Sequence, residues 1–199
     1  MTNPGFAELQ IVNALSRART GIARYLNLMD LFPTVNVSAD LDFQRQYNGF
    51  YKVRQRPSDW YKTYYHIMQD LRDQKPSFDE VLDLLHSRLG RCEASFASKM
   101  VATLDAHRPV WDTWVLKNMR IKPLTAGSPQ RFEQAKANYT RIQEWHDRFL
   151  ASENGRLVVS VFRNMVPQHA KVTDLKKVDF FLWKNRPEKA AVSEELSAN

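Results

Sequence analysis

The chain has 199 residues, of which 43% are hydrophobic and 26% are charged. This composition is ordinary for one globular domain with a proper core, and only 6 glycines argue against a turn-rich all-β fold. The 29 basic residues outnumber the 22 acidic ones, which gives a net charge of +7. Such a charge favours polyanionic partners such as nucleic acid, although solubility alone explains it equally well.

Cysteine content and hydropathy exclude several classes of protein. Cys92 is the one cysteine, so an intrachain disulfide and a cysteine-based zinc site are excluded. No apolar run approaches the roughly 20 residues that span a bilayer. The first ten residues lack the basic and then apolar order of a signal peptide. We therefore expect a cytoplasmic protein without membrane contact.

Familiar cofactor-binding patterns are also missing. The sequence contains no GxxxxGKS/T, GxGxxG, HExxH or GxSxG pattern, and its 5 histidines are scattered. Phosphate-loop ATPases, dinucleotide oxidoreductases and zinc hydrolases are therefore poor interpretations. We expect neither a metal nor another cofactor.

The first half of the chain predicts a series of amphipathic helices. Apolar residues recur at helical spacing over residues 6–29, and Pro33 ends this unit. Ser38 or Asp40 is placed to cap the next helix. A further helix follows over residues 60–71. Another begins at a capping box formed by Ser77 and Glu80 and ends at Gly90.

Residues 40–62 have the most unusual composition, because five cations interleave with six aromatic residues. Arginine and lysine contact phosphates and aromatic rings stack on bases, so this stretch is a candidate nucleic-acid surface. Its expected phosphate contacts are Arg45, Lys52, Arg54 and Arg56. The alternative is structural: four of the aromatic residues fall at helical spacing and can form core, with the cations on the solvated side.

Residues 90–119 form the stretch around which the other helices are expected to pack. A first helix carries Lys99 and is expected to end near His107. Pro109 then opens a second helix, whose first turns carry Trp111, Asp112 and Trp114.

The remaining chain predicts three more helices. Ser128 caps one that begins at Pro129 and ends near Ala151, where Asn154-Gly155 breaks the chain. Residues 156–165 have strand propensity, but their length and helical surroundings favour a short helix. Thr173 caps the last helix, on which lysines 176, 177 and 184 alternate with apolar residues. We expect an all-α fold, a single compact multi-helix domain over residues 1–187 with a polar, frayed tail at 188–199.

The run from Ser95 to Met119 resembles the core of the helix-hairpin-helix DNA glycosylases. In that family a lysine begins the second helix of a hairpin. A proline-containing turn follows, and then an aspartate that opens the next helix. Lys99, Pro109 and Asp112 stand in that order here. With the run KKVDFFLWK at 176–184, this resemblance indicates a bacterial family distantly similar to that fold.

The resemblance implies base-excision chemistry on double-stranded DNA. Lys99 would attack C1′ of the deoxyribose as the base departs, forming a Schiff base. Asp112 would stabilise positive charge at C1′ or help to move protons. The target base would leave the stack and enter a pocket formed by Tyr51, Trp111 and Trp114.

The family's hairpin holds a DNA phosphate through glycine-rich backbone, but residues 92–99 contain no glycine. The hydroxyls of Ser95 and Ser98, or amides at a helix N-terminus, are therefore the expected phosphate contacts.

Each functional interpretation has an alternative. Lys99 can be a solvated lysine on an amphipathic helix, and Asp112 an acid favoured by the helix dipole. At the level of the whole chain, the first alternative is a non-enzymatic helical binding or accessory module that keeps the fold without catalysis. The second is a protein-interaction domain whose charge serves solubility. The sequence does not indicate an oligomeric state.

Overall fold

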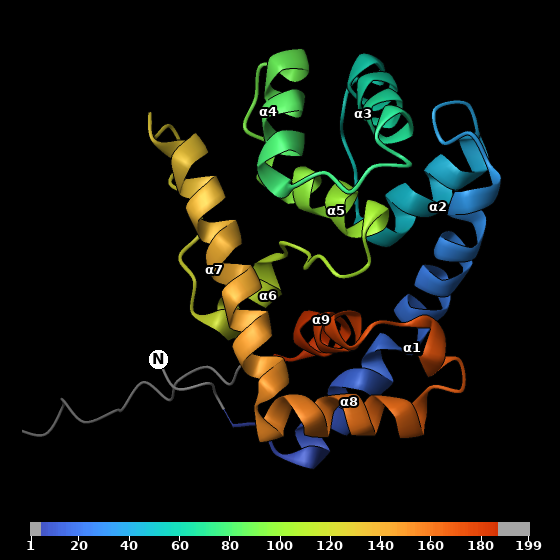
Figure 1. The fold of residues 1–199 in the computed structure, drawn as a ribbon, viewed down its shortest axis with the longest axis vertical. Coiled ribbons are helices and arrows are strands. Elements are labelled where there is room, and N and C mark those ends of the chain that lie inside the picture. The colour runs from blue at the N-terminus through green and yellow to red at the C-terminus, as the bar shows by residue number, and fades with distance from the viewer. Residues whose placement is uncertain (1–4, 187–199) are drawn as a thin grey trace, which may run out of the picture.

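Nine α-helices make up most of residues 5–186, the part of the chain that the computed structural model describes (Figure 1). They are α1 (Glu8–Leu31), α2 (Leu41–Tyr51), α3 (Ser58–Asp70), α4 (Phe78–Leu89), α5 (Ala94–Leu104), α6 (Thr113–Met119), α7 (Arg131–Ala151), α8 (Glu153–Met165) and α9 (Asp174–Lys184). This part of the chain contains no strand. The predicted all-α fold is confirmed, whereas the expectation for the tail at 188–199 lies outside the described residues.

Side-chain caps begin several helices where the sequence predicted them. The Ser77 hydroxyl accepts a hydrogen bond from the Glu80 amide, and the Glu80 carboxylate accepts one from the Ser77 amide. Gly90 ends α4 in the left-handed region at φ 65°. The Asp40 side chain caps α2 by accepting the Phe43 amide, and the Thr173 side chain caps α9 by accepting the Lys176 amide. Local signals therefore set these boundaries.

The helices form two groups (Figure 1). α2, α3, α4 and α5 lie on one side, and α7, α8 and α9 lie on the other. α1 packs along α9 and α8 in the second group and reaches α2 in the first. Helices from the two ends of the described chain thus share one core.

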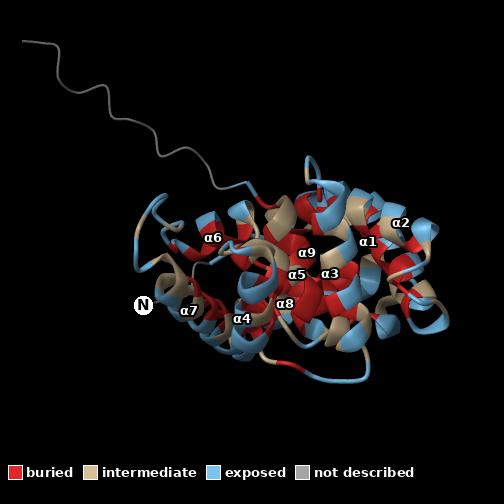
Figure 2. Cartoon of the chain, turned by 90° about the horizontal axis from the view of Figure 1, so that it is seen from above, coloured by how far each residue is buried: buried red, intermediate tan, exposed pale blue. Residues whose placement is uncertain are grey.

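α9 is the most deeply placed helix, and Figure 2 shows it in the interior, surrounded by the other helices. Every residue from Leu175 to Leu182 is buried. The lysines that alternate with apolar residues in the sequence are therefore buried too at positions 176 and 177. Each ammonium pairs with a carboxylate, Lys176 with Asp179 at 3.0 Å and Lys177 with Asp174 at 2.6 Å.

The helix boundaries around Pro109 also differ from the prediction. α5 ends at Leu104 rather than near His107, and α6 begins at Thr113 rather than at Pro109. The Asp105 carboxylate accepts a hydrogen bond from the His107 amide at 2.9 Å, which turns the chain out of the helix. Pro109 disfavours helical geometry at the residue before it. A connection of eight residues, 105–112, therefore separates the two helices, and we call it the connecting segment. It turns at 105–108, where the Arg108 amide donates to the Asp105 carbonyl oxygen at 3.0 Å, and has no regular secondary structure over 109–112.

The connection between α7 and α8 is shorter than predicted, because α7 ends at Ala151 and α8 begins at Glu153. Residues 156–165 are helical as expected, but Asn154 and Gly155 lie inside the first turn of α8 instead of breaking the chain. Ser152 caps α8 by accepting the Gly155 amide at 3.1 Å. A Cβ on Gly155 would lie 1.9 Å from the Phe149 carbonyl oxygen, so only glycine permits this close approach.

The aromatic residues of 40–62 are largely core, which favours the structural alternative for that stretch. Phe43 and Tyr47 are completely buried. The hydroxyls of Tyr47 and Tyr64 share a hydrogen bond of 2.7 Å, and Tyr64 donates to the Phe96 carbonyl oxygen. These rings join α2 to α3 and α5.

Candidate functional site

A pocket of about 260 Å³ opens between the two groups of helices. Its walls come from α1, α2, α5, α9 and the start of α6. It is lined by Tyr25, Phe50, Tyr51, Lys52, Ser95, Lys99, Val110, Trp111, Asp112, Thr113, Val115, Lys176, Asp179, Phe180 and Trp183. Aromatic rings thus surround a few charged groups, the usual make-up of a small-molecule site.

The structure brings Lys99, Asp112, Trp111 and Tyr51 together at this pocket. Burial lowers the pKa of the Lys99 ammonium to about 8, against an opposing effect of the Asp112 charge. The nearby Arg56 guanidinium lowers it further. The Lys99 nitrogen lies 4.7 Å from the centre of the Phe96 ring. Lys99 is therefore a shielded amine and not a solvated surface lysine.

The connecting segment explains how Asp112 reaches Lys99. Lys99 lies five residues before the end of α5, or roughly 7.5 Å along the axis. The four residues that follow the turn, 109–112, can span roughly 13 Å, which is enough to return over that distance. The Trp111 amide donates to the Ser98 hydroxyl at 2.9 Å, and the Ser95 hydroxyl donates to the Trp111 carbonyl at 3.1 Å. Two serines of α5 thus hold the residue before Asp112 beside their own helix.

These contacts correct the predicted role of the serines. Ser98 is completely buried, and its hydroxyl also donates to the Ser95 carbonyl at 2.9 Å, so it cannot contact a DNA phosphate. Ser95 lines the pocket, but its hydroxyl is engaged by Trp111. Both serines position the connecting segment.

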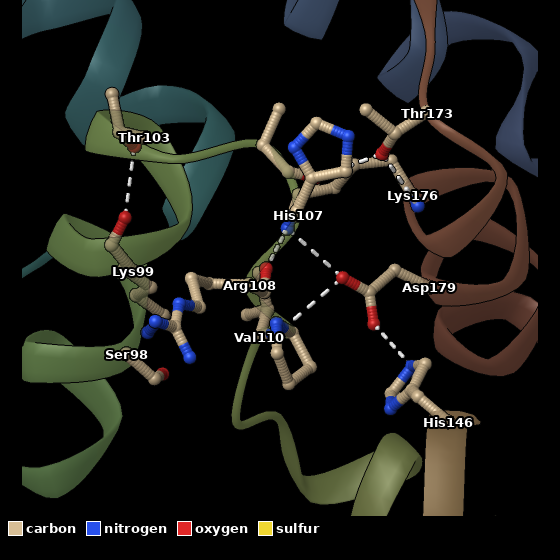
Figure 3. A network of polar contacts seen from close by, with 12 residues as sticks. Ser98, Lys99, Thr103, His107, Arg108, Val110, His146, Thr173, Lys176 and Asp179 are labelled. Atoms are coloured by element: carbon tan, nitrogen blue, oxygen red, sulfur yellow. Dashed lines mark hydrogen bonds and ion pairs between the residues drawn. The ribbon is translucent and has the colours of Figure 1, made fainter. Parts of the chain in front are cut away.

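Side chains from the second group of helices hold the other end of this segment (Figure 3). Thr173 donates to the Ala106 carbonyl at 2.7 Å, and Lys176 donates to the Arg108 carbonyl at 2.8 Å. Tyr139 donates to the Pro109 carbonyl at 3.0 Å. The segment is therefore fixed between α5 on one side and α7 and α9 on the other.

Asp112 begins α6 as its N-cap, and its carboxylate accepts the Trp114 amide at 2.8 Å. This position orients the side chain, and the positive end of the helix dipole favours its charge. Trp114, in contrast, is not among the residues that line the pocket. Its ring instead faces the Lys117 ammonium at 4.3 Å and the Arg186 guanidinium at 4.0 Å.

The four predicted phosphate-binding cations have different surroundings. Arg45 is exposed and pairs with Asp42 at 3.3 Å, and Arg54 is exposed on the loop after α2. Arg56 pairs with Glu93 at 3.3 Å and lies over the Trp60 and Phe96 rings, which leaves it little freedom to bind phosphate. Lys52 alone of the four lines the pocket.

Lys52 belongs to a set of cations beside the pocket that we call the rim cluster: Arg17, Lys52, Lys184 and Arg186. Burial lowers the pKa of Lys184, and the neighbouring Arg186, Lys52 and Arg17 lower it further. Arg17 donates to the Lys184 carbonyl at 3.3 Å. Within residues 5–186 none of the four forms an ion pair with a carboxylate. The sequence did not predict this cluster, because its members come from three segments that are distant in the chain.

A second feature that the sequence did not predict is a buried network centred on Asp179 of α9 (Figure 3). The carboxylate accepts from His146 at 3.0 Å, from Lys176 at 3.0 Å and from the Val110 amide at 3.2 Å. Burial alone would raise the pKa of Asp179, but Lys176 and His146 hold it below its ordinary value. The available signal was the place of Asp179 between Val178 and Phe180, on the apolar part of α9.

No family model matches the sequence, and no curated protein or solved structure matches the chain. None of the described helices is both long and apolar enough to cross a membrane. The described residues contain no group of three or more histidine, cysteine or acidic side chains placed to hold a metal ion. The site is therefore interpreted from its own geometry.

Proposed function

We propose that this chain is a DNA-binding protein of base-excision type, in which Lys99 is the Schiff-base nucleophile and Asp112 assists. The observation that carries the proposal is the shielded Lys99 amine, whose pKa is about 8, in an aromatic pocket that it shares with Asp112. At pH 7.5 such an amine is neutral in roughly a quarter of the molecules, against about 0.1% for an ordinary lysine. A neutral amine is what nucleophilic attack requires.

The chemistry follows from these two residues. At an abasic site, the Lys99 lone pair adds to the C1′ aldehyde carbon, and the carbinolamine then loses water to give the imine. At an intact nucleoside, the bond from Lys99 to C1′ forms as the glycosidic bond breaks, and the base leaves with that electron pair. Asp112 is placed to stabilise positive charge at C1′ or to accept a proton from the attacking amine.

The surroundings of the pocket support DNA as the substrate. Tyr51, Phe50 and Trp111 offer flat apolar faces for an extruded base. The rim cluster places unpaired cations next to the opening, where phosphates on either side of an extruded nucleotide would lie. Ser98 and Arg56 are not proposed as phosphate contacts, because Ser98 is buried and Arg56 is paired with Glu93.

Borohydride trapping on an abasic-site duplex tests the nucleophile. Wild-type protein is expected to form a covalent adduct at a rate that rises with pH up to about 8 and then levels off, because the neutral amine reacts. Lys99→Met should abolish the adduct and leave duplex affinity within about threefold.

Lys62→Met is the matched control, because Lys62 is an exposed lysine on α3 that does not line the pocket. It should trap like wild type. Duplex binding without any adduct from wild-type protein would leave the non-enzymatic binding module as the function. An adduct that persists in Lys99→Met would assign the nucleophile to another amine.

A further inference from the structure

A buried ion pair, Lys176 and Asp179, forms part of the pocket wall. Lys176 and Asp179 are 2% and 7% exposed, and both line the cavity. Replacing such a pair by apolar residues of similar volume is often neutral or stabilising, so packing alone does not explain it. Its place in the cavity wall suggests a role toward a ligand.

The hydrogen bonds of the pair leave capacity unused. The Lys176 ammonium has three protons, and two are given to the Arg108 carbonyl and the Asp179 carboxylate. The Asp179 carboxylate accepts three hydrogen bonds, from His146, Lys176 and the Val110 amide, where about four can be accommodated. One Lys176 proton therefore remains free. On Asp179 the spare acceptor capacity is on Oδ1, which accepts only from His146, because Oδ2 already accepts from Lys176 and from the Val110 amide.

His146 keeps this arrangement rigid. It is completely buried, and its two ring nitrogens face the Ile142 carbonyl at 3.0 Å and the Asp179 carboxylate at 3.0 Å. With the Val110 amide on the other carboxylate oxygen, Asp179 has little freedom to rotate. The free donor and acceptor are thus held in fixed positions, as recognition of a specific edge requires.

We infer that Lys176 and Asp179 recognise the edge of a lactam ring, with Lys176 donating to the ring carbonyl and the adjacent ring N–H donating to Asp179. Oxopurines and oxopyrimidines carry this edge. The inference rests on the proposed function in placing a base in this pocket, but recognition of the ring does not depend on catalysis.

The proposed chemistry favours a lactam over an amino-substituted ring. When the glycosidic bond breaks, the departing base takes the electron pair, and in a lactam the negative charge spreads onto the carbonyl oxygen. The Lys176 ammonium would lie against that oxygen and stabilise the charge in a site shielded from water. An aminopurine has no carbonyl oxygen to take this charge.

Calorimetric titration of the wild-type protein with free bases tests the inference without any variant that has to fold. Hypoxanthine carries the lactam edge, 1-methylhypoxanthine lacks its N–H, and purine lacks both groups. We expect hypoxanthine to bind at least tenfold more tightly than either. Equal affinities, or no binding of hypoxanthine up to its solubility, would overturn the inference.

Two lysine variants then locate the effect. Lys176→Met should remove the preference for hypoxanthine. Lys177→Met should keep it, because Lys177 is the neighbouring buried lysine of α9 but pairs with Asp174 and does not line the pocket. A lactam preference without borohydride trapping would retain this inference and reject the catalytic proposal. Borohydride trapping without a lactam preference would retain the catalytic proposal and reject this inference.

Discussion

Lys99 brings a cost in stability together with its reactivity. The folded protein shields the ammonium, and its pKa falls from 10.5 to about 8, which corresponds to roughly 3 kcal/mol of unfavourable burial of the charged form. Below pH 8 both the folded and the unfolded chain hold this proton, so the full cost is present. Between about 8 and 10.5 the unfolded chain holds it and the folded chain does not, so the free energy of unfolding rises with pH in that window.

Lys99→Met should therefore stabilise the protein at pH 7, by up to roughly 3 kcal/mol. The gain should shrink as the pH rises from 8 to 10.5. Urea unfolding at pH 7 and pH 10 measures both values. Lys62→Met, at an exposed position, should change stability by less than about 0.5 kcal/mol at either pH. A Lys99→Met protein less stable than wild type at pH 7 would show that the ammonium makes a net favourable contact.

At the scale of elements, the contact between α1 and α9 shapes one wall of the pocket. Gly21 of α1 faces Trp183 of α9, and a Cβ on Gly21 would lie 2.5 Å from a Trp183 ring carbon. Trp183 lines the pocket. The absence of a side chain at residue 21 therefore sets the position of an aromatic wall.

Gly21→Ala should move the Trp183 ring. Alanine favours helix over glycine by about 1 kcal/mol, whereas overpacking costs about 1–3 kcal/mol, so the net loss of stability is up to about 2 kcal/mol. Gly49→Ala is the matched control on α2, where nothing lies within 4 Å of the added Cβ, and it should stabilise by about 0.5–1 kcal/mol. Urea unfolding and tryptophan fluorescence measure both variants. Equal effects of the two substitutions would contradict this account.

Local sequence signals predicted the elements well and their assembly poorly. The capping box before α4 and Gly90 after it are decided by neighbouring residues, so the sequence revealed them. The burial of Lys176 was not predicted, because it depends on the packing of α9 against α1, α7 and α8. The sequence shows the order of Lys99 and Asp112, but the contacts of Ser95 and Ser98 with Trp111 that bring the two to one pocket depend on the fold.

At the scale of the whole molecule, the pocket lies where segments distant in the chain meet. Arg17 comes from α1, Lys52 follows α2, and Lys184 and Arg186 come from α9 and the residues after it. Only the assembled fold gathers these charges beside the opening. DNA binding, if it occurs at the pocket, should therefore depend on this cluster more than on the cations of residues 40–62 that lie away from it.

Replacing Lys52 and Lys184 together with alanine should weaken duplex binding and reduce the slope of log affinity against log salt by about two. Arg45→Ala with Arg54→Ala removes the same charge from exposed positions that do not line the pocket. That pair should change the slope by less than one. Binding titrations from 50 to 300 mM salt compare the two proteins. A larger change of slope in the Arg45 and Arg54 double variant would instead assign DNA binding to the exposed face of α2 and the loop after it.

The pairing of α1 with α9 also has a consequence for synthesis on the ribosome. α1 is made early, but its principal partner is the last described helix, roughly 140 residues later. At about 5–20 residues per second, that interval lasts roughly 7–30 seconds. Ile11, Leu15, Ile22 and Tyr25, which are buried in the finished fold, have no α9 to pack against during this time. The nascent chain therefore carries an apolar helix face that only a chaperone or its own later helices can cover.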